Sequence, residues 1–223
     1  MNQVLSQRES SKQVRRERIV DCARNLIRQE GFDALNIRAL AEAADVTVPT
    51  IYNLVGGKTV ILELMAREMV QQLVSAHETS TTRDPIEKAE EVIAEMRAIY
   101  AADEKLSREV MLALDKLDSP LVARSSFHQP GRVVAIEDCQ RALDDGLLAG
   151  KISSRILARG LTNAFAQAQH SWLLGHISLQ EMENQALIGC FITLAADAKP
   201  KLHARLVEKI QRLGEGSGFL GSE

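Results

Sequence analysis

The sequence predicts an all-α protein in two parts, a small N-terminal three-helix domain and a larger C-terminal helical domain. With 223 residues, the chain is long enough to form both parts, each with its own apolar core. Aromatic residues make up only 4%, and Ala, Leu, Glu and Arg are frequent, a composition that favours helices. Apolar residues recur at helical spacing, and no stretch alternates as a strand would.

The first predicted helix covers residues 12–30 and ends at Gly31, a residue type common just beyond a helix end. Phe32 and Leu35 follow and are expected to pack beneath the helices. The apolar face of this helix consists of Ile19, Ala23, Leu26 and Ile27.

Two short helices joined by a tight turn are predicted next, between residues 36 and 54. Asn36 stands where an N-cap is wanted, and Asp45 occupies the turn, where Asp tolerates left-handed backbone. Thr47 can cap the second helix, and Pro49 lies in its first turn, where a missing N–H is tolerated. This is a helix-turn-helix, whose second helix, Val48–Leu54, would enter a major groove.

The rest of the chain is predicted to form further helices. A long helix follows Gly56-Gly57, and Asp84-Pro85 opens the next as N-cap and first helical residue. Either Ser153 or Ser154 can cap a long helix, and Ser178 with Glu181 forms a capping box. Helices are expected over residues 59–79, 84–100, 105–117, 132–149, 154–175, 178–198 and 201–213, with a short helix or loop at 121–127.

These elements divide the chain into five expected segments. They are a flexible arm (1–11), the helix-turn-helix domain (12–58), a connecting helix (59–83), a regulatory and dimerisation domain (84–213) and a disordered tail (214–223).

Charge is distributed unevenly along the chain. The net charge of the whole chain is −3, so a nucleic-acid surface must be local. Basic residues outnumber acidic ones in the first thirty residues. Taken alone, this pattern would favour a solvated helix face, but its position before a helix-turn-helix favours phosphate contact.

Other classes of protein find little support. The three cysteines lack the spacing of a metal site or a disulfide framework, so no metal or cofactor is expected. No catalytic motif is placed in a fitting context, and a GxGxxG pattern at residues 216–221 has no strand before it. The longest apolar stretch, around residues 188–196, is too short to span a membrane. We therefore expect a cytoplasmic protein that is not an enzyme.

Many positions between Arg16 and Leu62 together resemble one known family. They are the Arg-x-x-Ile-x-x-x-Ala-Arg-Asn-Leu run, Glu30-Gly31-Phe32, Leu40-Ala41, Ala44-x-Val46-Thr47, Thr50-Ile51-Tyr52 and Lys58. This stretch resembles the DNA-binding domain of the tetracycline-repressor-like (TetR-type) transcriptional regulators. The chain departs from the family at Asp45, where Gly is usual, at Val55, where Phe is usual, and at Asn53-Leu54, where His or Arg is common.

The resemblance implies a regulator that binds double-stranded operator DNA as a homodimer and responds to a small-molecule effector. It implies phosphate contacts by Tyr52, Lys58, Thr47 and Asn36, with Arg15 and Arg16 near the backbone or minor groove. The alternative for Tyr52 is a core aromatic. Candidates for contacts with base edges are Val48, Pro49, Thr50 and Asn53, with a phosphate or water contact equally open for Asn53.

The larger helical part is expected to hold the dimer face and the effector pocket. Apolar stripes on the two long helices suggest a dimer face of Ala158, Leu161, Ala164, Phe165, Ala168, Trp172, Leu187, Phe191 and Leu194. Possible pocket residues are Met96, Tyr100, Met111, Phe127, His128, Phe165 and Gln169, which favour an apolar or amphipathic effector. For both sets the alternative is plain intramolecular core. A rival interpretation of the whole chain is a helical small-molecule or partner-binding module with a vestigial DNA-binding half.

Overall fold

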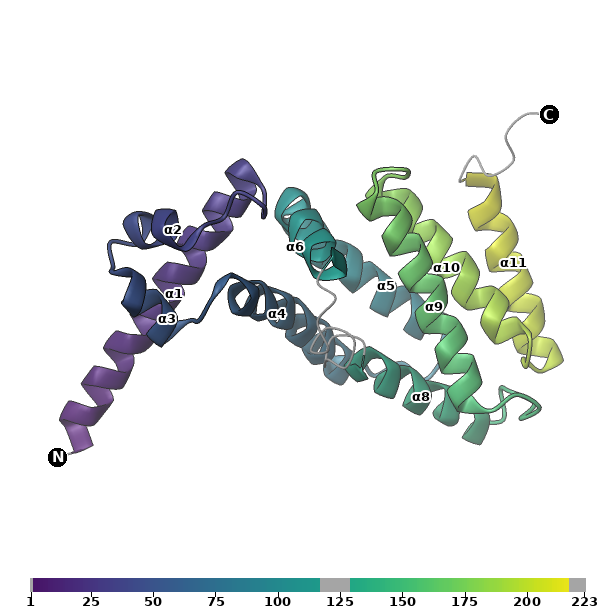
Figure 1. The fold of residues 1–223 in the computed structure, drawn as a ribbon. Helices are drawn as coiled ribbons and strands as arrows, with labels where there is room; N and C mark the ends of the chain where they lie inside the picture. The colour runs from purple at the N-terminus through teal and green to yellow at the C-terminus, as the bar shows by residue number, and fades with distance from the viewer. Residues whose placement is uncertain (1, 117–128, 217–223) are drawn as a thin grey trace. The chain divides into compact units, whose positions relative to one another are not determined.

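The computed structural model describes residues 2–116 and 129–216, with side chains for 9–75, 80–116 and 131–215 (Figure 1). This part of the chain is helical apart from its connections and one isolated bridge between Leu148 and Ala198. The helices are α1 (Asn2–Glu30), α2 (Ile37–Ala43), α3 (Val48–Leu54), α4 (Lys58–Thr79), α5 (Pro85–Ala102), α6 (Glu104–Lys116), α8 (Gln129–Asp144), α9 (Ser154–Leu173), α10 (Leu179–Ala195) and α11 (Pro200–Gly216). The all-α prediction is confirmed. The element expected at 121–127 lies outside the described residues.

The helices form two compact units. One comprises Met1–Met69 and Asp103–Ala123, and the other comprises Val70–Ala102 and Arg124–Glu223. Helix α6 thus belongs to the unit of α1–α3, although the sequence placed it within the regulatory segment 84–213. The reason is the packing of α6 against α1, which charge pairs distant in the sequence reinforce.

Several helix ends differ from the sequence expectation, including the start of α8 at Gln129 rather than 132 and the end of α10 at Ala195 rather than 198. Helix α1 begins at Asn2 rather than near residue 12, because no Gly or Pro interrupts the helix-forming residues before Ile19. Helix α8 ends at Asp144 rather than at 149, since Gly146 turns the chain with a φ of +71°. Helix α11 continues past 213 to Gly216.

The core of the first unit closes around α1. Ile19, Ala23 and Ile27 are each fully buried, as are Leu40 of α2 and Ile51 of α3. The predicted packing of Phe32 and Leu35 beneath these helices is confirmed, because both side chains are buried. Burial of apolar surface at these positions fixes α2 and α3 against α1.

The second unit is organised around a tight α9–α10 pair. A Cβ placed on Gly160 would lie 2.5 Å from the Thr193 side chain, and one on Gly189 would lie 2.7 Å from that of Ala164. The two glycines therefore let α9 and α10 approach closely. Helix α10 also packs against α5 and α11, and α8 packs against α9.

A buried carboxylate joins the two ends of this helix pair. Asp197, after α10, is 3% exposed and accepts hydrogen bonds from the backbone N–H groups of Gly150 (2.8 Å), Lys151 (2.9 Å) and Ile152 (3.2 Å). Ser153 then caps α9 by accepting from the N–H of Ile156, which decides between the two serines considered. Asp197 thus holds the loop that starts α9.

Replacing Asp197 with Ala is expected to destabilise the second unit by about 2–4 kcal/mol, because three backbone donors lose a charged acceptor. The single tryptophan, Trp172, lies in this unit, so urea unfolding followed by its fluorescence measures the free energy of unfolding. The control Asp144→Ala removes an exposed carboxylate and should cost no more than about 0.5 kcal/mol. Equal losses for the two variants would contradict the role given to Asp197.

Candidate nucleic-acid interface and regulatory contacts

Helix α3 buries one side chain, exposes three and leaves the other three half-buried. Ile51 is its one buried residue and is fully enclosed. The neighbouring Tyr52 is 57% exposed, which excludes the alternative of a core aromatic. Asn53 and Pro49 are also exposed, whereas the other two base-edge candidates, Val48 and Thr50, are half-buried. Helix α3 therefore presents a mixed polar and apolar surface.

The turn before α3 has the backbone geometry that the sequence predicts. Asp45 adopts a φ of +49°, and in the described residues it is the one non-glycine with positive φ. Asn36 caps α2 by accepting a hydrogen bond from the N–H of Ala39 at 2.8 Å. The Arg18 guanidinium donates to the Asp45 carbonyl oxygen at 3.4 Å and so ties α1 to the turn.

Thr47 stands at the N-cap position of α3, but its side chain makes no capping bond. Its hydroxyl lies 2.8 Å from the hydroxyl of Thr50 in a shared hydrogen bond. The expectation that Thr47 caps α3 through its side chain is therefore wrong. The Thr47 hydroxyl instead forms its hydrogen bond with Thr50, three residues along the chain.

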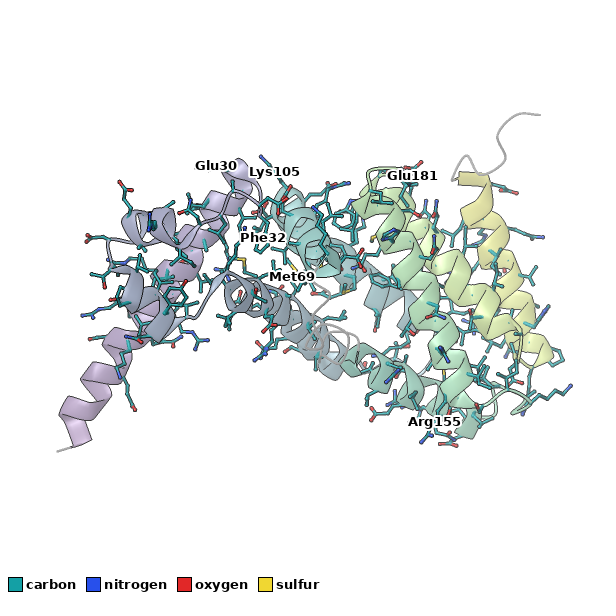
Figure 2. All side chains as sticks on the ribbon, in the orientation of Figure 1. Glu30, Phe32, Met69, Lys105, Arg155 and Glu181 are labelled. Atoms are coloured by element: carbon teal, nitrogen blue, oxygen red, sulfur yellow. The ribbon has the colours of Figure 1, made fainter. Side chains whose placement is uncertain are left out.

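Lys58 begins α4 and already has partners within the protein. Its ammonium group donates to the Asp33 carbonyl oxygen at 3.1 Å and lies 4.4 Å from the centroid of the Phe32 ring. Phe32, labelled in Figure 2, lies where the loop after α1 meets the start of α4. An ammonium group has three N–H donors, so the Asp33 contact leaves two for another acceptor.

Helix α6 is bonded to the same loop and to α1. The Arg28 guanidinium donates to one Asp103 carboxylate oxygen through Nε at 2.7 Å and through Nη2 at 2.5 Å. A Glu109 carboxylate oxygen accepts from the Phe32 N–H at 3.0 Å, and Lys116 lies 3.7 Å from Asp33. The sequence analysis missed these contacts. Asp103 just before a predicted helix is a local signal for an N-cap. It does not show that Arg28, 75 residues earlier in the chain, is its partner.

The Asp103 carboxylate also caps α6 by accepting from the Leu106 N–H at 3.2 Å. Partial burial raises the pKa of Asp103, but the hydrogen bonds from Arg28 and Leu106 outweigh it, so the pKa lies below its ordinary value. A carboxyl with a lowered folded-state pKa contributes stability above its unfolded pKa, and that stability is lost as pH falls through the folded value. This contact is therefore fully formed at neutral pH.

Two of the effector-pocket candidates lie together in the second unit. The Gln169 amide donates to the Tyr100 hydroxyl, and the Tyr100 ring stacks on Trp172 with centroids 4.9 Å apart. Burial raises the pKa of Tyr100 despite this hydrogen bond, so the phenol stays neutral. Met96 and Phe165 are half-buried, and Met111 is buried in the first unit. Phe127 and His128 lie outside the described residues.

An open hollow of about 570 Å³ lies elsewhere in the second unit, and no effector candidate lines it. Arg155, labelled in Figure 2, lies there at the start of α9. The two other arginines that line the hollow each form a salt bridge, Arg83 with Asp145 and Arg141 with Asp138. The hollow is lined by Arg83, Ile136, Glu137, Gln140, Arg141, Asp144, Ser154 and Arg155.

Most residues expected at the dimer face are buried within the single chain. Ala158, Ala168, Trp172, Leu187, Phe191 and Leu194 are between 0% and 8% exposed, so they form intramolecular core. Leu161, Ala164 and Phe165 are half-buried. The large apolar side chains exposed on α9 and α10 are instead Ile156 (64%) and Ile192 (56%). They escaped the sequence analysis because they lie off the main apolar stripes.

Part of the first unit is similar to one family of known proteins. Residues 19–65 match the bacterial regulatory proteins of the tetR family. The HTH-type transcriptional repressor KstR of Rhodococcus jostii (strain RHA1) is 28% identical over 110 residues, 49% of this chain and 51% of KstR. The matched part thus spans about half the length of this curated relative.

Solved structures share the fold over most of the chain. SmeT, the repressor of the Stenotrophomonas maltophilia multidrug efflux pump SmeDEF, has a TM-score of 0.69 at 18% identity, covering 84% of this chain and 92% of SmeT. A SmeT–triclosan complex has a TM-score of 0.66 at 19% identity, covering 85% and 94%. Thermus thermophilus FadR with lauroyl-CoA, a TetR-family transcriptional repressor, has a TM-score of 0.64 at 22% identity, covering 83% and 97%.

The two N-cap positions of the helix-turn-helix allow a paired test. Asn36→Ala should destabilise α2 against local opening by about 1 kcal/mol, because a backbone donor loses its cap. Thr47→Ala should affect α3 less, since the Thr47 side chain makes no capping bond. Amide hydrogen exchange of residues 37–43 and 48–54 measures both effects. An equal or larger loss of protection in the Thr47 variant would contradict the capping geometry.

Proposed function

We propose that this chain belongs to the tetR family of bacterial regulatory proteins, which residues 19–65 match, and is a transcriptional repressor that binds operator DNA and is released by a small molecule. The observation that carries the proposal is the surface of α3. Within the region that matches the family, burial of Ile51 turns Tyr52 and Asn53 outward. A helix held in this way can enter a major groove with its outer side chains.

Phosphate contacts position the protein on the duplex. The exposed Tyr52 hydroxyl and the remaining Lys58 donors are suited to phosphate oxygens. Asn36 and Thr47 flank them with polar groups on the same motif, and Arg15 and Arg16 add charge from α1. The Asp33 contact holds the Lys58 ammonium near the start of α4, where free helix N–H groups also favour an anion.

Helix α3 offers few long polar side chains with which to recognise the DNA sequence. Helix α3 contains no Lys or Arg, so the common bidentate contact with guanine is absent from it. Asn53 is the exposed polar candidate for a base edge, and Pro49 and Val48 can contact thymine methyl groups. The Thr50 hydroxyl is shared with Thr47. DNA shape therefore contributes to operator choice.

Two copies are proposed to bind a palindromic operator as a homodimer, with recognition helices about 34 Å apart. The exposed Ile156 and Ile192 support a face on α9 and α10, which would cover apolar surface otherwise open to water. The buried side chains around Trp172 form the intramolecular core of the same two helices.

Effector control is proposed to act through chain connectivity between the units. Tyr100 lies in the last turn of α5 and is fixed by Gln169 and Trp172, and Asp103 follows within one turn and pairs with Arg28. An effector that displaces the Tyr100 cluster would shift Asp103 and α6, and with them the helix-turn-helix unit. It can shift this equilibrium only by its differential affinity for the two states.

The effector is proposed to be apolar or amphipathic. The SmeT complex with triclosan and the FadR complex with lauroyl-CoA support this class on a shared fold. The aromatic and amide groups of Tyr100, Trp172 and Gln169 are suited to an apolar body with one polar group. Because the proposed partner is bacterial operator DNA, we place the protein in the cytoplasm.

A gel-shift assay with DNA flanking the gene tests the proposal. A discrete complex that survives excess unrelated DNA is expected. Absence of a complex even at low salt would favour a ligand- or partner-binding module with a vestigial DNA-binding half. The features that favour this second function are the short polar set on α3 and the internal partners of Thr47, Thr50 and Lys58.

Lys58→Ala should weaken binding to all DNA sequences. It should also make the slope of the logarithm of the binding constant against the logarithm of the salt concentration less negative, by about 1 per protomer. The loss follows from one phosphate contact removed without a change in base readout. Fluorescence anisotropy over a salt series measures it, with Lys201→Ala, an exposed lysine of α11, as control. An unchanged salt slope would remove Lys58 from the phosphate contacts.

Ile192→Arg should shift the protein towards monomer, because an exposed apolar side chain of the proposed dimer face becomes charged. Sedimentation velocity reads the distribution of species. Val133→Arg places the same charge at a 50% exposed position of α8 and should leave it unchanged. A dimer that persists in the Ile192 variant would place the dimer contact elsewhere.

A further inference from the structure

The N-terminal part of α1, before Ile19, contributes no described side chain to the buried core. Burial begins at Ile19 and Val20, whereas no side chain from 9 to 18 is buried, and Val14 is 61% exposed. The helix nevertheless continues to Asn2, about 25 Å along its axis from Arg18. Figure 1 shows this end of α1 running beyond α2 and α3. Packing therefore does not explain the helix at residues 9–18, where side chains are described.

The same stretch is basic in an acidic chain. Residues 2–18 contain five basic side chains and two acidic ones, although the whole chain has a net charge of −3. The helix N-terminus adds a partial positive charge at its free end. This positive potential attracts a polyanion.

Two of the basic side chains, Lys12 and Arg15, lie on the side of α1 that faces the helix-turn-helix. Arg15 and Lys12 lie four and seven residues before Ile19, a spacing that puts them on the Ile19 side of the helix. Ile19 is fully buried in the core against which α2 and α3 pack. Glu17 points away from this side and accepts a hydrogen bond from Gln13 at 2.7 Å. The positive side is thus directed towards the duplex that α3 would contact.

We propose that the N-terminal part of α1, through Lys12 and Arg15, binds phosphates of duplex DNA outside the half-site that α3 of the same protomer reads. This rests on the proposed function and adds a second DNA contact to it. Lys12 lies about 9 Å from Arg18 along the helix axis, which matches about three base pairs of duplex at 3.4 Å per pair, so the contact falls within about seven base pairs of flanking DNA. The contact is independent of sequence, lengthens the footprint and makes affinity depend on flanking DNA.

The test compares two duplexes bound by the full chain. A site is selected from a randomised duplex of about 30 base pairs, three helical turns. It is then prepared as a short duplex that ends at the half-sites and as a long one with about seven further base pairs at each end. For the wild-type chain the salt slope should be steeper on the long duplex by about 2 per protomer. Lys12 and Arg15 each add one phosphate contact there, and each contact contributes about 0.9 to the slope.

The variant Lys12→Gln/Arg15→Gln should bind both duplexes with the same slope, because the flanking contact is lost. The matched control Lys151→Gln/Lys201→Gln removes the same charge from exposed positions of the second unit and should keep the wild-type difference. Equal slopes on both duplexes for the wild type would overturn the inference while leaving the proposed function standing. If the wild type binds no selected duplex at low salt, both fall.

Discussion

Burial of the Ile51 side chain is the constraint on which the surface of α3 depends. A helix of seven residues is too short to be stable alone, so its position comes from tertiary packing. Ile51 is fully buried, as are Ile19 and Ile27 of α1 and Leu40 of α2, and α3 packs against both of these helices. Because one side of the helix is fixed inward, Tyr52 and Asn53 must face outward. A polar residue at this position would release α3 and remove the surface that we propose contacts DNA.

Local chemistry made much of the fold predictable. The Asn36 cap, the left-handed Asp45, the Asp84 cap and the Ser178–Glu181 capping box each follow from residue types within a few positions, and each is present. Helical spacing likewise identified the buried faces of α1 and α9. Such features are local, so the sequence contains the information that specifies them.

Features that depend on distant partners were not predictable. The Thr47 hydroxyl and the Lys58 ammonium each have a protein acceptor nearby, and spacing does not show which one wins. The Arg28–Asp103 pair, which reinforces the packing of α6 against α1, joins residues that are far apart in the chain. The strongest apolar stripes on α9 and α10 proved to be core, because burial within one chain and burial between two chains use the same residue types.

We propose that the two units have separate tasks, with DNA contact in the unit of α1–α3 and effector response in the unit of α5 and α8–α11, which holds Tyr100. Hydroxyl-radical footprinting of the full chain on a selected duplex tests this account most directly, because it maps contacts along the DNA. The account predicts two protected stretches of equal strength, related by two-fold symmetry and centred about 34 Å apart. A single protected stretch, or uniform cleavage at low salt, would contradict it.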